Sequence, residues 1–244
     1  MKTFITRTLT AAALLTTLAL PAVAQQNERQ PRTISITATA KVTHTADVAT
    51  VHIGYIAYGP DKDTAYANAA KLSNTIIDTL KKNGVPADAI ESQNQNIAAT
   101  QPYEINNLSA SEKAQKAWQV TQSWTVRTNA DDSAKVLDIA TRAGANQSGH
   151  IDWSLRDVNA AQGEAAAKAL QLAQQQAQTM AAGLNVKLGL LLSANNTIDS
   201  EPVRPVMMAM RAAAGDEAYE AKKLEISPRK IDTTATVTAS FEIN

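Results

Sequence analysis

The stretch that decides the fold is Trp118-Gln119-Val120-Thr121-Gln122-Ser123-Trp124-Thr125-Val126-Arg127. Every second side chain from 118 to 126 is large or apolar, apart from one glutamine, and the positions between them are polar. A period of two is typical of a β-strand that buries one face. We therefore predict a strand over residues 118–127 with both tryptophans on the same face.

Six further segments on either side of this strand also have strand character. They are residues 33–42, 48–58, 90–100, 150–155, 187–192 and 231–243. Residues 45–47 are expected to form a short turn between the first two segments, so a hairpin is predicted there. The segment 187–192 is a short apolar run that favours a buried strand.

Three segments instead repeat apolar residues at helical spacing. The first stripe is Ala65, Ala69, Leu72, Ile76 and Leu80. The second helix is expected to open at Asp131, and the third to run over about 160–182 after a cap at Asp157 or Asn159. The stripe expected on the third helix is Ala166, Ala169, Ala173, Ala177, Met180 and Leu184. Residues 103–116 are expected to form a loop.

These elements predict an α+β fold with about seven strands, in an antiparallel or mixed sheet, and about three helices. The two β-α-β segments at 48–100 and 118–155 share their element order, which suggests an internal duplication. We expect one domain over residues 33–244. It would carry a mobile insertion at about 199–230, where three prolines interrupt any clear periodicity.

The N-terminus has the features of a cleaved signal peptide at residues 1–24. A basic start is followed by the apolar run 9–20 and by Ala22-Val23-Ala24. Residues 25–32 are then a flexible leader. We expect export to the periplasm, with association to the outer membrane left open, and no transmembrane segment in the mature chain, because the apolar run is shorter than the roughly 20 residues that span a bilayer.

Composition excludes several classes of protein. The chain of 244 residues has 23 basic and 23 acidic residues and no cysteine. Removal of 1–24 takes away Lys2 and Arg7, so 21 basic against 23 acidic residues leave a net charge of −2. This balance argues against a nucleic-acid binder. Without cysteine there is neither a disulfide framework nor a thiolate metal site.

No recognised catalytic or cofactor motif is present in the sequence. The three histidines are His44, His52 and His150, and none has a partner at the H-x-x-x-H spacing. His44 and His52 flank the predicted turn, but solvated strand residues explain them better than a metal pair does. Asp61 and Asp63 fit helix capping rather than a calcium loop. We therefore predict no catalytic residue, no cofactor and no metal ligand.

Five residues are candidates for an interface. Trp118 and Trp124 share one face of a strand, where they either fill the sheet core or contact a neighbouring subunit. Met207, Met208 and Met210 lie together in the predicted insertion. Their thioethers could bind a soft metal, undergo reversible oxidation or pack against a protein partner. The remaining alternative is that these methionines have no specific role.

Several segments in order resemble the SIMPL-domain family of exported bacterial proteins. They are Asp47 to Val51, Leu80 to Pro86, Val120 to Arg127, Ala143 to Asn146, Val186 to Gly189 and Val237 to Glu242. The resemblance implies a non-enzymatic periplasmic protein that self-assembles and supports envelope integrity or oxidative-stress defence. It implies a homo-oligomer, with an envelope protein as a further partner. The alternative is a binding module that captures a protein partner or a soft metal with the methionine-rich insertion.

Overall fold

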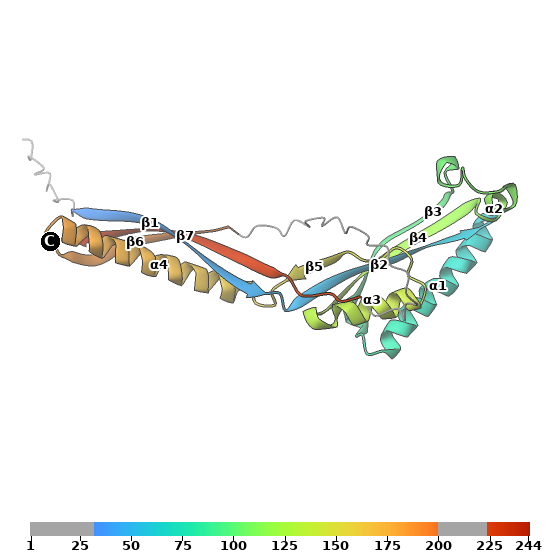
Figure 1. The fold of residues 1–244 in the computed structure, drawn as a ribbon, viewed down its shortest axis with the longest axis horizontal. Helices are drawn as coiled ribbons and strands as arrows, with labels where there is room; N and C mark the ends of the chain where they lie inside the picture. Colours follow the sequence, from blue (N-terminus) through green and yellow to red (C-terminus); the bar gives the residue numbers. More distant parts are fainter. Residues whose placement is uncertain (1–31, 200–223) are drawn as a thin grey trace, which may run out of the picture.

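The computed structural model describes residues 32–199 and 224–244, and it folds as two antiparallel sheets at opposite ends of an elongated chain (Figure 1). One sheet has the strand order β1-β7-β6 and the other the order β3-β4-β2-β5. The strands are β1 (Thr33–Thr45), β2 (Val48–Gly59), β3 (Ile90–Ala99), β4 (Trp118–Asn129), β5 (Ile151–Ser154), β6 (Leu188–Asp199) and β7 (Lys230–Ile243).

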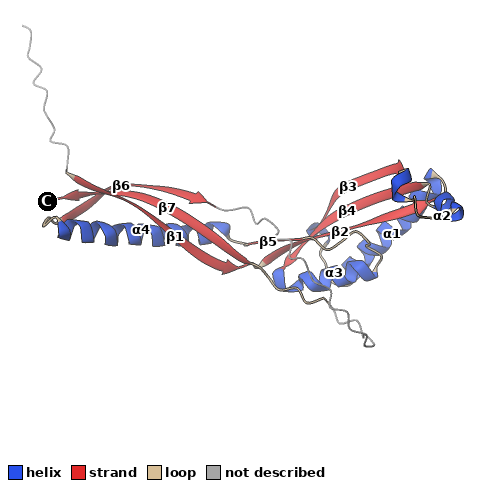
Figure 2. Cartoon of the chain, turned by 45° about the horizontal axis from the view of Figure 1, so that its top comes forward, coloured by secondary structure: helices blue, strands red, loops and turns tan. Residues whose placement is uncertain are grey.

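The helices confirm the α+β class predicted from the sequence. They are α1 (Lys62–Lys82), α2 (Ala110–Gln115), α3 (Ser133–Arg142) and α4 (Val158–Gly183). Figure 2 shows that α4 lies along the sheet β1-β7-β6, whereas α1 and α3 lie along the other sheet. We call β1, α4, β6 and β7 the three-stranded unit. Residues 48–154 are the four-stranded unit.

The four-stranded unit has the chain order β2-α1-β3-β4-α3-β5. Because β4 lies between β2 and β3, and β2 lies between β4 and β5, each β-α-β segment encloses one strand of the other. This is the split β-α-β arrangement of ferredoxin-like folds. The shared element order seen in the sequence therefore corresponds to two segments with equivalent places in one sheet.

The core of this unit lies between the sheet and the two helices. Helix α1 buries Ala65, Ala69, Ile76 and Leu80, four of the five members of the predicted stripe. Asp61 caps its N-terminus, accepting hydrogen bonds from the Thr64 backbone N–H and hydroxyl at 2.8 Å each. These hydrogen bonds hold the pKa of the Asp61 carboxyl below its usual value. Capping, as predicted, is the structural role of Asp61.

In the three-stranded unit the helix contributes only alanine to the buried core, and the sheet contributes larger side chains such as Ile36 and Phe241. Along α4 the buried side chains recur every four residues, at Ala161, Ala165, Ala169, Ala173, Ala177 and Ala181. They pack mainly against β1 and β7. The predicted stripe was partly wrong, since Met180 and Leu184 are exposed. The buried side chains at this regular spacing of four residues are all alanine. Such small side chains let the helix approach the sheet closely.

The predicted hairpin between the first two strands is not formed. Strand β1 pairs with β7 along its whole length, from Thr33 opposite Glu242 to Thr45 opposite Lys230, and β2 pairs with β4 and β5. Asp47 lies at the change of sheet and accepts the Arg156 backbone N–H at 2.7 Å through its carboxylate. The chain therefore continues from one sheet into the other instead of turning back.

Two further expectations differ from the structure. Residues 103–116, expected as a loop, contain α2, which Ser109 and Glu112 cap reciprocally. Most of the run 187–192, expected as a buried strand, forms the start of β6, where Leu188 is half-buried but Leu190, Leu191 and Leu192 are exposed. An apolar run predicts burial only where another layer covers it, and α4 lies mainly against the other two strands.

The predicted signal peptide, most of the leader and most of the predicted insertion lie outside the described residues. The ends of the insertion are described: Asp199 is the last residue of β6, and Lys230 is the first of β7. Between them, Ile226 packs against the core of the four-stranded unit.

Candidate functional site

The two tryptophans singled out from the sequence differ in exposure. Trp124 on β4 is 3% exposed and lies in the core, with its ring centroid 5.7 Å from that of Tyr55. Trp118, at the start of β4, is half-buried at the edge of the same core. Core packing therefore explains the position of Trp124, and the interface role of Trp118 stays a prediction.

The glutamine between the tryptophans also has a structural partner. The Tyr55 hydroxyl donates to Gln122 Oε1 at 3.0 Å and is 2.9 Å from the Ala69 carbonyl oxygen of α1. Burial raises the pKa of the Tyr55 hydroxyl. Gln122 thus satisfies a polar group inside the sheet core. The other candidates, Met207, Met208 and Met210, lie outside the described residues.

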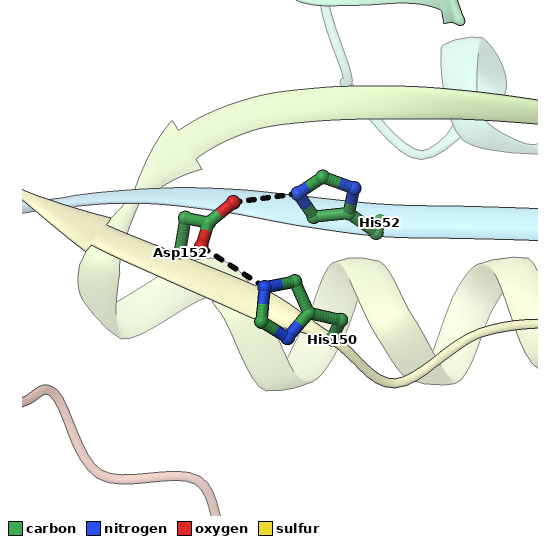
Figure 3. A group of neighbouring side chains, drawn as sticks. All are labelled: His52, His150 and Asp152. Atoms are coloured by element: carbon green, nitrogen blue, oxygen red, sulfur yellow. Dashed lines mark hydrogen bonds and ion pairs between the residues drawn. The ribbon is translucent and has the colours of Figure 1, made fainter. Parts of the chain in front are cut away.

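Three polar side chains that the sequence did not place together converge on the four-stranded sheet. They are His52 of β2, His150 just before β5, and Asp152 of β5 (Figure 3). His52 Nε2 donates to Asp152 Oδ2 at 2.7 Å, and His150 Nε2 donates to Oδ1 at 3.0 Å. The two imidazole centroids are 4.9 Å apart. We call these three residues the His-Asp cluster.

Strand pairing explains why the cluster forms. The register of β2 with β5 places Val51 opposite Ile151 and Thr50 opposite Asp152. Continued by one pair, it places His52 opposite His150, and the His52 backbone N–H donates to the His150 carbonyl at 2.9 Å. Since alternate residues share a face, all three side chains project on the side away from the buried Val51 and Ile53.

The segment before β5 holds His150 in this register. Asn146 binds both backbone groups of Ile56 through its side-chain amide, at 2.8 and 3.0 Å. Gln147 N–H donates to the Gly54 carbonyl at 2.9 Å. Gly149 has φ +127°, a conformation that residues with a Cβ rarely adopt. Residues 146–150 are therefore fixed along β2 by hydrogen bonds.

The cluster is accessible to solvent. The His52, His150 and Asp152 side chains are 40%, 50% and 56% exposed. Partial burial raises the pKa of Asp152, but the hydrogen bonds from His52 and His150 outweigh it and leave this pKa below its ordinary value. A carboxylate between two imidazoles, open to the medium, is a group of donors that a cation can reach.

The third histidine lies elsewhere. His44 is on β1, and its Nε2 is 3.0 Å from the Glu164 carboxylate of α4, in an ion-pair contact. The alternative of a metal pair between His44 and His52 required the predicted hairpin, and it is wrong because β1 and β2 belong to different sheets. The sequence did contain one usable signal, because His150 and Asp152 are two residues apart on a predicted strand and so share a face. Only the pairing of β2 with β5 adds His52.

A second candidate site is the outer edge of β6. Leu190, Leu191 and Leu192 are 75%, 46% and 47% exposed. In the part of the chain that the structure describes, β6 pairs only with β7, and the pairing is irregular between Leu188 and Ser193. We call Leu190–Leu192 the leucine edge. It combines apolar side chains with an outer backbone edge that pairs with no strand among residues 32–199 and 224–244.

Comparison with known proteins assigns the chain to a family. The model of the SIMPL family, described as a protein of unknown function (DUF541), matches residues 34–241. The chain belongs to the SIMPL family. The resemblance noted from the sequence is thereby confirmed, and the matched region of this SIMPL chain covers both sheets except for the first residue of β1 and the last two of β7.

Two curated relatives extend this assignment. The SIMPL chain is 25% identical over 224 residues to proteins named "26 kDa periplasmic immunogenic protein", from Brucella melitensis and from Brucella abortus. The alignment covers 88% of this chain and 89% of each relative. These names describe a location and an immune response rather than a reaction.

Among the described residues of this SIMPL chain, no helix is both long enough and apolar enough to cross a membrane.

Proposed function

We propose that this chain is a periplasmic, non-enzymatic protein that assembles with copies of itself through the leucine edge of β6. One observation carries the proposal: an apolar run that the sequence predicts to be buried is exposed in the single chain. The names of the two relatives support a periplasmic location. The expected signal peptide at residues 1–24 supports it as well.

Two of the other sheet edges, β1 and β3, lack these features. Strand β1, at the opposite edge of the same sheet, exposes mainly threonine, serine and lysine, including Thr37 and Lys41. The outer strand β3 exposes Glu91 and a run of amides, and it is interrupted by a bulge at Ser92 to Asn94. Charges and bulges protect natural edge strands from unwanted pairing. The leucine edge carries no charged residue, so it is the edge best suited to receive a strand.

A second copy of the chain is the occupant that these features favour. Two β6 strands related by a two-fold axis would pair antiparallel, and each would satisfy the backbone groups of the other. The same arrangement would bring the leucines of the two copies together. Removing three such side chains from water contributes about 1–2 kcal/mol each.

We propose that the assembly supports envelope integrity or oxidative-stress defence. This part of the proposal rests on the family resemblance and on the periplasmic relatives. An elongated chain with an exposed apolar edge suits a structural role, and no catalytic group is needed for it.

The assembly is tested with the chain from Gln25 onwards, by native mass spectrometry and multi-angle light scattering at micromolar concentration. We expect a multimer for the wild type. The double variant Leu190→Lys/Leu192→Lys should be a monomer, because two charges would have to be buried in the pair. Thr37→Lys, on the exposed face of β1, is the matched control and should assemble normally.

A wild-type chain that remains monomeric at these concentrations would refute the assembly. The cellular role has a separate test, in which a deletion strain is complemented with the wild type or with the double variant. We expect only the wild type to restore tolerance to peroxide and to detergent. Full rescue by the monomeric variant would separate the cellular role from assembly.

A further inference from the structure

We propose that the His-Asp cluster is a binding site for a divalent transition-metal ion, held by His52, His150 and Asp152. The proposal is independent of the leucine edge, because the cluster lies on the four-stranded unit and β6 on the other. It also departs from the sequence-based expectation of no metal ligand.

The donors have the right chemistry. Two imidazoles and one carboxylate are ligands typical of zinc, copper, nickel and iron sites. Magnesium and calcium prefer sites made of oxygen atoms alone. With three protein ligands, one or more coordination positions stay open to water or to a group from another molecule.

The geometry needs little change to receive an ion. One ligand atom from each of the three residues lies within 4.8 Å of the other two. In a tetrahedral site with bonds of about 2.0–2.1 Å, neighbouring ligand atoms are roughly 3.3 Å apart. The two Nε2 atoms already approach the Asp152 carboxylate to 2.7 and 3.0 Å. Rotation of exposed side chains therefore completes the site without movement of the strands.

The backbone beneath the cluster is fixed. His52 and Asp152 lie within paired strands, and His150 is joined to His52 by a backbone hydrogen bond of 2.9 Å. A Gly149 N–H bond to the His52 carbonyl at 3.4 Å closes the other side of this pair. Metal sites on paired strands lose less conformational freedom on binding than sites on loops.

A rival interpretation is that the cluster is only a set of surface ion pairs. Exposed ion pairs contribute little to stability and are common. A metal site differs because all three side chains must act together, whereas in ion pairs the loss of one histidine leaves the other contact intact. This difference defines the test.

The test titrates the chain from Gln25 onwards, after treatment with EDTA, with zinc chloride in a calorimeter at neutral pH. We expect saturable binding of about one ion per chain with micromolar affinity. His52→Gln, His150→Gln and Asp152→Asn should each weaken binding by about tenfold or more. His44→Gln is the matched control, since it removes the remaining histidine, which also faces a carboxylate, and it should bind as the wild type does.

Cobalt(II) provides a second readout. Its visible absorption bands should appear on binding to the wild type, disappear in the three variants and resist an excess of magnesium. Copper(II) should displace zinc, as the Irving–Williams order requires. Far-UV circular dichroism checks the fold of each variant, and two correctly folded variants suffice for the comparison.

Two results would overturn the proposal. One is the absence of saturable zinc binding up to about millimolar concentration, the weak limit of specific affinity. The other is binding that survives unchanged in the folded variants of the cluster, which would place the ion elsewhere. The Leu190→Lys/Leu192→Lys variant should bind zinc normally, so failure of the metal site and failure of the assembly are distinguishable.

Discussion

The two units of the molecule achieve burial in different ways. The four-stranded unit places two helices on its sheet and fills the space with bulky side chains, among them Tyr55, Ile76, Leu80 and Trp124. The three-stranded unit has one helix, whose buried face consists of alanine. The face of this sheet that points away from the helix is polar. It carries hydroxyl pairs between β1 and β7, such as Thr37 with Thr238 and Thr39 with Thr236, each with its two oxygens 3.0 Å apart.

This difference shows which unit has most to gain from a partner. Hydrophobic stabilisation grows with the apolar area removed from water, and an alanine removes little. One helix also leaves β6 largely uncovered, because α4 lies mainly against β1 and β7. The unit with the smaller side chains in its core is therefore the one that exposes leucine, and assembly would bury what its own helix does not.

The largest effect is expected where the core is bulky. Leu80 of α1 is fully buried, so Leu80→Ala should lower the free energy of unfolding by about 2–5 kcal/mol. All three tryptophans lie in the four-stranded unit, so urea unfolding followed by tryptophan fluorescence reports on this unit. Leu224→Ala, an exposed leucine, is the control and should change little. Equal stability of Leu80→Ala and the wild type would contradict this core.

A smaller loss is expected when the alanine contact is overfilled. Ala173 is fully buried between α4 and the sheet. Ala173→Leu should destabilise the three-stranded unit by about 1–3 kcal/mol, because the helix must move away from β1 and β7. Far-UV circular dichroism during urea unfolding measures it. Gln174→Leu adds the same side chain at an exposed position of α4 and should be neutral. A neutral Ala173→Leu would show that α4 does not pack closely on the sheet.

The helix caps provide a matched pair across the two units. Asp61 caps α1 and Asp157 caps α4, each accepting a backbone N–H at 2.8 Å. Asp61→Ala and Asp157→Ala should each cost about 1 kcal/mol in urea unfolding. Asn is the conservative control at both positions, since it also caps well. A cost confined to one helix would mean that the other helix start is already frayed in solution.

The smallest effect concerns acid stability of the three-stranded unit. Hydrogen bonds from Lys41 and then Thr43 hold the pKa of the Asp232 carboxyl below its ordinary value. A lowered folded pKa stabilises the fold above the unfolded pKa, about 3.9, and this contribution is lost as pH falls through the folded pKa. Asp232→Asn should therefore be slightly less stable than the wild type at pH 7. The difference should vanish in acid, as followed by thermal unfolding, and a difference independent of pH would contradict it.

Local periodicity predicted most elements, because it depends only on neighbouring residues. The stripe of α1 and the strand 118–127 follow from spacing along the chain, and the structure selects Asp157 from the two caps, Asp157 or Asn159, that the sequence offered for α4. Strand pairing does not. The alternation in β1 is the same whether the strand pairs with β2 or with β7, and the sequence gives no distance between Thr33 and Glu242. Adjacency in sequence favoured the hairpin, and the structure has none at that position.

The candidate sites depend on the same missing information. The His-Asp cluster requires the register of β2 with β5, which joins residues about a hundred positions apart. The leucine edge requires knowledge of which strands α4 covers. In both cases the residue types were visible in the sequence, but their surroundings were not. Long-range strand pairing brings the three residues of the His-Asp cluster together, and it places the leucine edge at the outer side of a sheet.

The continuation of β1 into β2 has a consequence for measurements in solution. Residues 33–59 run almost without interruption along the molecule, and 27 extended residues span on the order of 90 Å. A 26.0 kDa chain of this length diffuses more slowly than a sphere of equal mass. It will elute early from a gel-filtration column even as a single chain. Small-angle scattering should therefore give a maximum dimension far above that of a globular protein of this size, and elution volume alone would overstate the number of copies.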